Sequence, residues 1–140
     1  MIGILLATHG NFAPGIVDAM ELICGPQEKV KALPLRIKDD VEEYGKELLK
    51  MADELDDGDG VLILSDLMGG SPANVVCKFI LEKDRVEAVA GLNFPMLIEA
   101  VESRSYMNLK ELSIACLRTG TSGISNIREV LLQASEDDED

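Results

Sequence analysis

Residues 4–15 read ILLATHGNFAPG and combine the features that decide the fold. The apolar run over residues 2–7 is continuous rather than alternating, which is typical of a β-strand covered on both faces. Thr8, His9 and Gly10 follow it directly, and a helical pattern begins a few residues later. His9 is the only histidine in 140 residues. We therefore expect a strand, a short loop that carries the imidazole, and a helix, in that order.

Strand and helix patterns continue to alternate along the rest of the chain. Apolar segments predict further strands over residues 30–37, 60–64 and 86–92. Apolar residues at helical spacing predict helices over residues 14–24, 40–55, 72–81, 95–103 and 109–117. Ser71 suits the N-cap of the third helix, with Pro72 at its first position. This order predicts an α/β fold, a doubly wound parallel sheet with helices on both faces.

Composition predicts one compact domain over residues 1–133, followed by an acidic disordered tail over residues 134–140. The formal charge is -13, from 26 acidic and 13 basic residues, which argues against binding to nucleic acid or anionic membranes. No apolar run approaches a membrane span, and the start of the chain does not resemble a signal peptide, so we expect a cytoplasmic protein. The three cysteines are far apart in sequence and predict neither disulfides nor a zinc site.

The order of the strands predicts which residues share the functional site. In doubly wound sheets, ligands bind beyond the carboxyl ends of the strands where the winding reverses, commonly between the first and third strands. His9 follows the first strand and Asp66 follows the third, so their side chains share one crevice if these strands are neighbours. A carboxylate that accepts the Nδ1 proton of an imidazole leaves Nε2 with an outward lone pair. His9 and Asp66 are therefore the candidate catalytic residues, with His9 as nucleophile.

The loop after Asp66 has the features that a phosphoryl group attacked by His9 needs. Gly69 and Gly70 allow close approach of the backbone, and Ser71 opens a helix whose free N–H groups favour an anion. Neither loop contains Lys or Arg, so backbone dipoles hold the group without a strong cation, which suits a group that leaves again. We expect no metal and no cofactor. The loop predicts a carrier of a phosphoryl group rather than a tight binder.

Three motifs together resemble a known family. They are THG at residues 8–10, DLMGGSPAN at 66–74 and AGLNFPMLIE at 90–99. In this order they resemble the IIA component of the mannose-type phosphoenolpyruvate-dependent sugar phosphotransferase system, and the similarity runs to about residue 130. Met68 departs from relatives that carry an aromatic residue there.

The resemblance implies a four-stranded parallel sheet of order 2-1-3-4 and a phosphocarrier. In such a protein HPr donates a phosphoryl group to His9 at Nε2, and His9 passes it to a IIB component for coupled sugar uptake and phosphorylation. The resemblance also implies a homodimer that exchanges a C-terminal strand, for which residues 129–133 are the candidate, although their pattern equally allows the end of a helix. Because an acidic tail follows, we expect the IIB component to be a separate chain. Phosphoryl-binding roles are implied for Ser71, Gly70, Gly69, Thr8, Gly10 and Asn74.

Other classes of function remain open. A phosphotransfer subunit of a phosphoenolpyruvate-dependent dihydroxyacetone kinase would have the same fold and the same early histidine. A flavodoxin-like binding module would need a phosphate loop, and the nearest candidate, TGTSGISN at residues 119–126, has no lysine and follows a helix. A receiver domain phosphorylated on Asp66 would need an acidic pair where Thr8 and His9 stand.

Overall fold

The computed structural model describes residues 1–139 and has four strands and six α-helices within them. The strands are β1 (Gly3–His9), β2 (Val30–Leu35), β3 (Val61–Ser65) and β4 (Val86–Ala90). The helices are α1 (Phe12–Cys24), α2 (Val41–Leu55), α3 (Ser71–Cys77), α4 (Phe94–Ser103), α5 (Leu109–Ser122) and α6 (Ile127–Glu139), with a 3₁₀ turn, η1 (Ile80–Glu82), after α3.

The four strands form one parallel sheet of order β2-β1-β3-β4, which confirms the predicted fold class and strand order. β1 therefore lies between β2 and β3, with Leu35 opposite His9 and Ser65 opposite Ala7. The winding of the chain reverses between β1 and β3. The carboxyl ends of these two strands lie side by side at one end of the sheet, where the predicted site lies.

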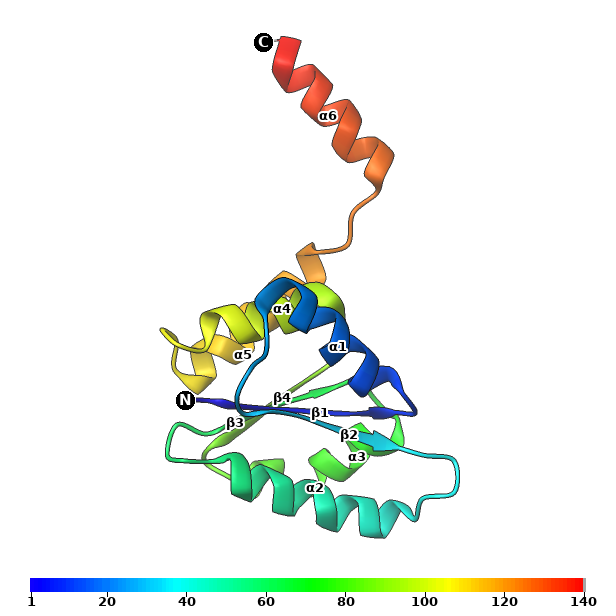
Figure 1. Cartoon of the computed structure of the whole chain (residues 1–140), viewed down its shortest axis with the longest axis vertical. Coiled ribbons are helices and arrows are strands. Elements are labelled where there is room, and N and C mark those ends of the chain that lie inside the picture. The colour runs from blue at the N-terminus through cyan, green and yellow to red at the C-terminus, as the bar shows by residue number, and fades with distance from the viewer. Residues whose placement is uncertain (140) are drawn as a thin grey trace.

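Helices cover both faces of the sheet, and each face has its own apolar core (Figure 1). Ile4 and Leu6 of β1 pack with residues of α1, α4 and α5, whereas Leu5 and Ala7 pack with residues of α2 and α3. All of β1 is buried except its last residue, His9. The apolar run at the start of the chain is continuous because both faces of the strand are covered, as the pattern predicts.

Side-chain caps begin α2, α4 and α5, whereas the N-cap residues of α1 and α3 make no side-chain cap hydrogen bond. Asp40 caps α2 by accepting from the backbone N–H of Glu42 at 2.9 Å. α3 differs from its prediction in two respects: Gly70 is the N-cap, so that Ser71 and Pro72 are its first two residues, and the helix ends at Cys77 rather than at residue 81. The chain tightens there into η1 because Phe79 and Ile80 turn to pack against the α2–α3 side of the core.

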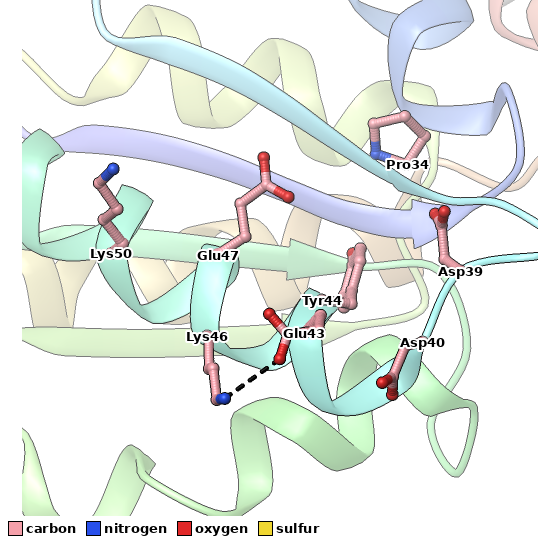
Figure 2. A pocket seen from close by; sticks show the side chains of 8 residues that line it. All are labelled: Pro34, Asp39, Asp40, Glu43, Tyr44, Lys46, Glu47 and Lys50. Carbon is pink, nitrogen blue, oxygen red and sulfur yellow. Dashed lines mark hydrogen bonds and ion pairs between the residues drawn. The ribbon is translucent and has the colours of Figure 1, made fainter.

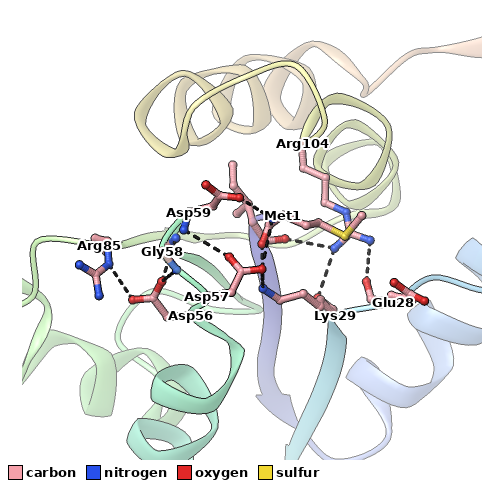
Figure 3. Close-up of polar contacts among 11 residues, drawn as sticks. Met1, Glu28, Lys29, Asp56, Asp57, Gly58, Asp59, Arg85 and Arg104 are labelled. Carbon is pink, nitrogen blue, oxygen red and sulfur yellow. Dashed lines mark hydrogen bonds and ion pairs between the residues drawn. The ribbon is translucent and has the colours of Figure 1, made fainter.

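The amino ends of the strands are tied together by charged groups (Figure 3). Arg104 is buried, and its guanidinium donates to the carbonyl oxygens of Ile2, Glu28 and Lys29 and to the side chain of Gln27. Nearby, the Lys29 ammonium lies 2.8 Å from the Asp57 carboxylate. These contacts join the end of α4 to the amino edge of the sheet.

The C-terminal segment is helical, which is one of the two alternatives that the sequence allows for residues 129–133. Residues 129–133, the candidate exchanged strand, lie inside α6, and residues 134–139 continue that helix in place of the predicted disordered tail. Asp140 lies outside the described residues. The side-chain amide of Gln133 donates to Asp137 one turn later, a local contact that favours the helix. α6 extends away from the body of the protein (Figure 1) and exposes Ile127, Val130 and Leu131.

Candidate functional site

His9 and Asp66 lie in contact at the carboxyl edge of the sheet. The Nδ1 atom of His9 is 2.8 Å from Oδ2 of Asp66, and the same oxygen accepts the backbone N–H of His9 at 3.0 Å. A carboxylate only accepts hydrogen bonds, so Nδ1 carries the proton and Nε2 of the neutral ring keeps its lone pair. The His9 side chain is 48% exposed and that of Asp66 only 14%. The carboxylate therefore orients the ring through Nδ1, while about half of the His9 side chain is accessible to solvent.

The start of α3 lies against the open side of the ring. A Cβ atom placed on Gly70 would come within 2.7 Å of Cε1 and 3.3 Å of Nε2 of His9, so only glycine fits between the helix and the imidazole. Gly69 before it has a φ of +90°, a conformation that favours glycine. The Asn74 side chain donates to the Gly69 carbonyl at 3.1 Å and fixes the turn. The structure thus brings Gly70 beside the His9 ring, with Gly69 before it and Ser71 after it in the chain. Contact of these residues and Asn74 with a phosphoryl group stays a prediction.

Thr8 and Gly10 build the loop around His9 rather than facing it. Thr8 is fully buried, and its hydroxyl accepts the backbone N–H of Ala13 at 2.9 Å in the first turn of α1. Gly10 has a φ of +51° and donates its N–H to Leu35 of β2 at 2.8 Å. The hydroxyl of Thr8 is thus committed to a helix start. A contact of Thr8 with a phosphoryl group, which the resemblance implies, stays a prediction.

Two buried polar atoms at the end of β3 have no hydrogen-bond partner within the described part of the chain. They are the hydroxyl of Ser65 and the Oδ1 atom of Asp66. Asp66 therefore uses one oxygen for both contacts with His9. A buried polar atom without a partner is costly, and such atoms concentrate at functional sites.

Sequence reasoning missed Arg36, which follows the carboxyl end of β2. Its Nη1 atom donates to the side-chain oxygen of Asn11, two residues beyond His9, at 2.6 Å. The expectation that no cation lies near the site was based on the His9 and Asp66 loops alone. The order 2-1-3-4 contained the missing signal, because it places the end of β2 beside the end of β1.

A charged hollow lies between β2 and α2 and is separate from these residues (Figure 2). It is lined by Pro34, Asp39, Asp40, Glu43, Tyr44, Lys46, Glu47 and Lys50. Tyr44 donates its buried hydroxyl to the Leu33 carbonyl at 2.7 Å. Burial, and secondarily the negative charge of Asp66, raise the pKa of Tyr44, so this hydroxyl stays neutral beneath the site.

The fold and the site together define a doubly wound α/β protein with an accessible histidine that a carboxylate orients at the switch point. Residues 3–116 match the family model described as the PTS system fructose IIA component. The chain is 32% identical over 132 residues to the "PTS system mannose-specific EIIAB component" of Escherichia coli, an alignment that covers 91% of this chain and 40% of that relative. It therefore spans less than half the length of this relative.

Solved structures agree with the match. Phosphotransferase system component EIIA from Streptococcus agalactiae has a TM-score of 0.85 and 31% identity, with 92% of this chain and 99% of that chain covered. The PTS IIA protein associated with the fucose utilization operon of Streptococcus pneumoniae has a TM-score of 0.82 and 34% identity, with coverage of 92% and 95%. The chain belongs to the mannose-type IIA components of the sugar phosphotransferase system.

Two further observations bear on the kind of protein. Within residues 1–139, no helix has the length and apolar character needed to cross a membrane. The same residues contain no group of three or more His, Cys, Asp or Glu side chains placed to hold a metal ion.

Proposed function

We propose that His9 accepts a phosphoryl group at Nε2 from phospho-HPr and passes it to a IIB component that phosphorylates an incoming sugar. The observation that carries this proposal is the 2.8 Å contact between Nδ1 of His9 and Oδ2 of Asp66, which leaves Nε2 as the exposed nucleophile. The family supports the direction of transfer, since the IIA component stands between HPr and IIB.

The chemistry is a displacement between two histidines. The lone pair of Nε2 attacks phosphorus, the nitrogen–phosphorus bond in HPr breaks, and its electron pair returns to the donor's ring. The proton on Nδ1 of His9 stays in its hydrogen bond to Asp66, which stabilises the positive charge that the ring gains. Transfer to IIB reverses these steps. Most of the acceleration comes from positioning and charge stabilisation, which the fixed ring and the adjoining backbone of Gly70 supply.

The sugar system is favoured over the dihydroxyacetone kinase subunit. Similar proteins include fructose-specific and sorbose-specific EIIA components, at 28% and 25% identity. In this role the protein works in the cytoplasm, where HPr and the cytoplasmic face of the sugar permease meet. Its negative surface attracts partners with positive patches, so docking rates fall with added salt.

The homodimer is part of the same proposal. β4 pairs with β3 along one edge, and within residues 1–139 no strand covers its other edge. Ile124, Ile127, Val130 and Leu131 expose apolar side chains on the segment that leaves the body. If this segment of one chain packed along the free edge of β4 in a second chain, its apolar side chains and that edge would both be covered. Sedimentation velocity of the full chain tests this: a dimer supports the proposal and a monomer at high concentration contradicts it.

The carrier role is tested by incubating the protein with phosphoenolpyruvate, enzyme I and HPr. We expect an acid-labile phosphate on His9, located by mass spectrometry and ³¹P NMR, and no label on His9→Ala of unchanged circular dichroism. Absence of label with all other components active, or label on His9→Ala, would refute the proposal.

A further inference from the structure

Arg36 directly follows β2, the strand that pairs with β1 on the side of His9, at the same carboxyl end of the sheet. The preceding residue, Leu35, is the Cα partner of His9, and its carbonyl accepts the N–H of Gly10 at 2.8 Å. Neighbouring strands are about 4.8 Å apart, a gap that an extended arginine side chain spans. The guanidinium already reaches across it, because Nη1 donates to Asn11 at 2.6 Å. Arg36 thus belongs to the rim of the histidine crevice.

The charge of Arg36 is not neutralised by the surrounding residues. The guanidinium has no carboxylate within 4.0 Å in the described part of the chain, although acidic residues outnumber basic ones two to one. Asp39 accepts from the backbone N–H of Arg36 at 2.7 Å, not from its side chain. The contrast with Arg85 is clear, since its Nε atom lies 2.8 Å from the carboxylate of Asp56. Arg36 is exposed and holds only the neutral amide of Asn11.

A phosphoryl group on His9 would create a demand for such a cation. A phosphate carries about two negative charges at neutral pH, and here it would stand on the ring whose other nitrogen contacts the Asp66 carboxylate. The loop from Asp66 to Asn74 contains no Lys or Arg. A hydrogen bond between arginine and phosphate is about twice as strong as one between neutral groups and is commonly bidentate.

We propose that, when His9 is phosphorylated, the guanidinium of Arg36 leaves the Asn11 side chain and binds the phosphoryl oxygens. Arg36 thereby stabilises the phosphorylated form of this chain. The step is a change of rotamer and of hydrogen-bond partner, and no covalent bond changes. The inference rests on the proposed function, because it requires a phosphoryl group at Nε2.

The test uses the full chain with phosphoenolpyruvate, enzyme I and HPr, and compares wild type with Arg36→Gln, Arg36→Lys and Lys38→Gln. Lys38 is the matched control, since its loss removes one positive charge from the same exposed loop. Two quantities are measured: the equilibrium constant for transfer from phospho-HPr, and the pH midpoint of the ³¹P shift of the phosphohistidine.

In Arg36→Gln we expect the equilibrium constant to fall about tenfold, the loss expected for one hydrogen bond to a charged group. The ³¹P midpoint should rise by about one pH unit, because the arginine favours the dianion. The equilibrium constant of Arg36→Lys should lie between those of wild type and Arg36→Gln, since an ammonium binds at one point. The equilibrium constant of Lys38→Gln should match that of wild type within twofold.

The outcomes separate the two proposals. Label on His9 in Arg36→Gln with an unchanged constant and midpoint would overturn the role of Arg36 and leave the carrier function intact. An equal loss in Lys38→Gln would show a general effect of charge and overturn the direct contact. No label in the wild type would overturn both.

Discussion

The substitution Gly70→Ala tests the packing of α3 against the His9 imidazole and needs no change of backbone conformation. Gly70 has φ and ψ of -75° and 163°, an extended conformation that alanine adopts freely. The added Cβ atom would lie 2.7 Å from Cε1 of His9 and 3.3 Å from Nε2. The local fold is therefore expected to persist, while the imidazole is pushed away from the helix.

The size of the effect follows from the contact distance. Ordinary van der Waals contact begins at 3.4 Å, so the ring has to move by about 0.7 Å from the 2.7 Å position. Such a movement strains the 2.8 Å hydrogen bond to Asp66 and turns Nε2 away from an in-line approach. Because a misplacement of about 1 Å costs on the order of 100-fold in rate, we expect phosphorylation by phospho-HPr to slow about tenfold to 100-fold.

Rapid-quench measurement of phosphohistidine formation gives the rate, and urea unfolding gives the stability. Gly15→Ala is the matched control, because a Cβ there meets nothing within 4 Å and Gly15 lies in the exposed first part of α1. We expect its rate to be unchanged and its free energy of unfolding to rise by about 0.5–1 kcal/mol. A Gly70→Ala protein that is phosphorylated as fast as wild type would refute the placement of α3 against the ring.

Three further substitutions test other contacts. Asp66→Asn keeps the acceptor nitrogen of His9 but weakens the control of its tautomer, so the phosphorylation rate should fall about tenfold to 100-fold, and an unchanged rate would mean that Asp66 is only structural. Arg104→Met leaves buried carbonyl oxygens without a donor and should lower the free energy of unfolding in urea by about 3 kcal/mol. A loss below about 1 kcal/mol would contradict a stabilising role for the Arg104 hydrogen bonds. The hydrogen bond from Lys29 lowers the pKa of Asp57 to about 2, so this carboxylate stabilises the fold above its unfolded pKa of about 3.9 and stops doing so as the pH falls through about 2. Asp57→Asn should therefore lose less stability than wild type between about pH 4 and about pH 2, and identical pH profiles would contradict the pairing.

Arg118→Gln serves as the control for Arg104→Met. Arg118 is exposed on α5, and its loss should change the free energy of unfolding by less than about 0.5 kcal/mol. The comparison separates the buried hydrogen bonds of Arg104 from the mere removal of a positive charge in an acidic chain.

The sheet and the central pair of the site could be predicted because short-range patterns determine them. A continuous apolar run identifies β1 and β3 as covered strands, and the winding rule places them side by side. His9 is the last residue of β1 and Asp66 directly follows β3, so the contact between them needs no information about loops.

Other features could not be predicted because they depend on long-range packing. Thr8 adjoins the histidine in sequence, but the strand alternation turns its hydroxyl to the other face, where it caps α1. Arg36 is 27 residues from His9 and joins the site only through the pairing of β2 with β1. Residues 129–133 have a pattern that fits strand or helix, and the choice depends on what covers their apolar side chains.

In the proposed function the two ends of the sheet have different tasks: the amino end stabilises the fold, and the carboxyl end transfers the phosphoryl group. At the amino end the cations have partners: the guanidinium of Arg104 donates to carbonyl oxygens, and Lys29 pairs with Asp57. At the carboxyl end, within residues 1–139, one buried oxygen of Asp66 has no hydrogen-bond partner and the guanidinium of Arg36 has no carboxylate within 4.0 Å. A carrier must bind the phosphoryl group about equally well before and after each transfer, since tight binding would trap it. A site with one movable cation and a fixed carboxylate meets that requirement better than a ring of basic residues would.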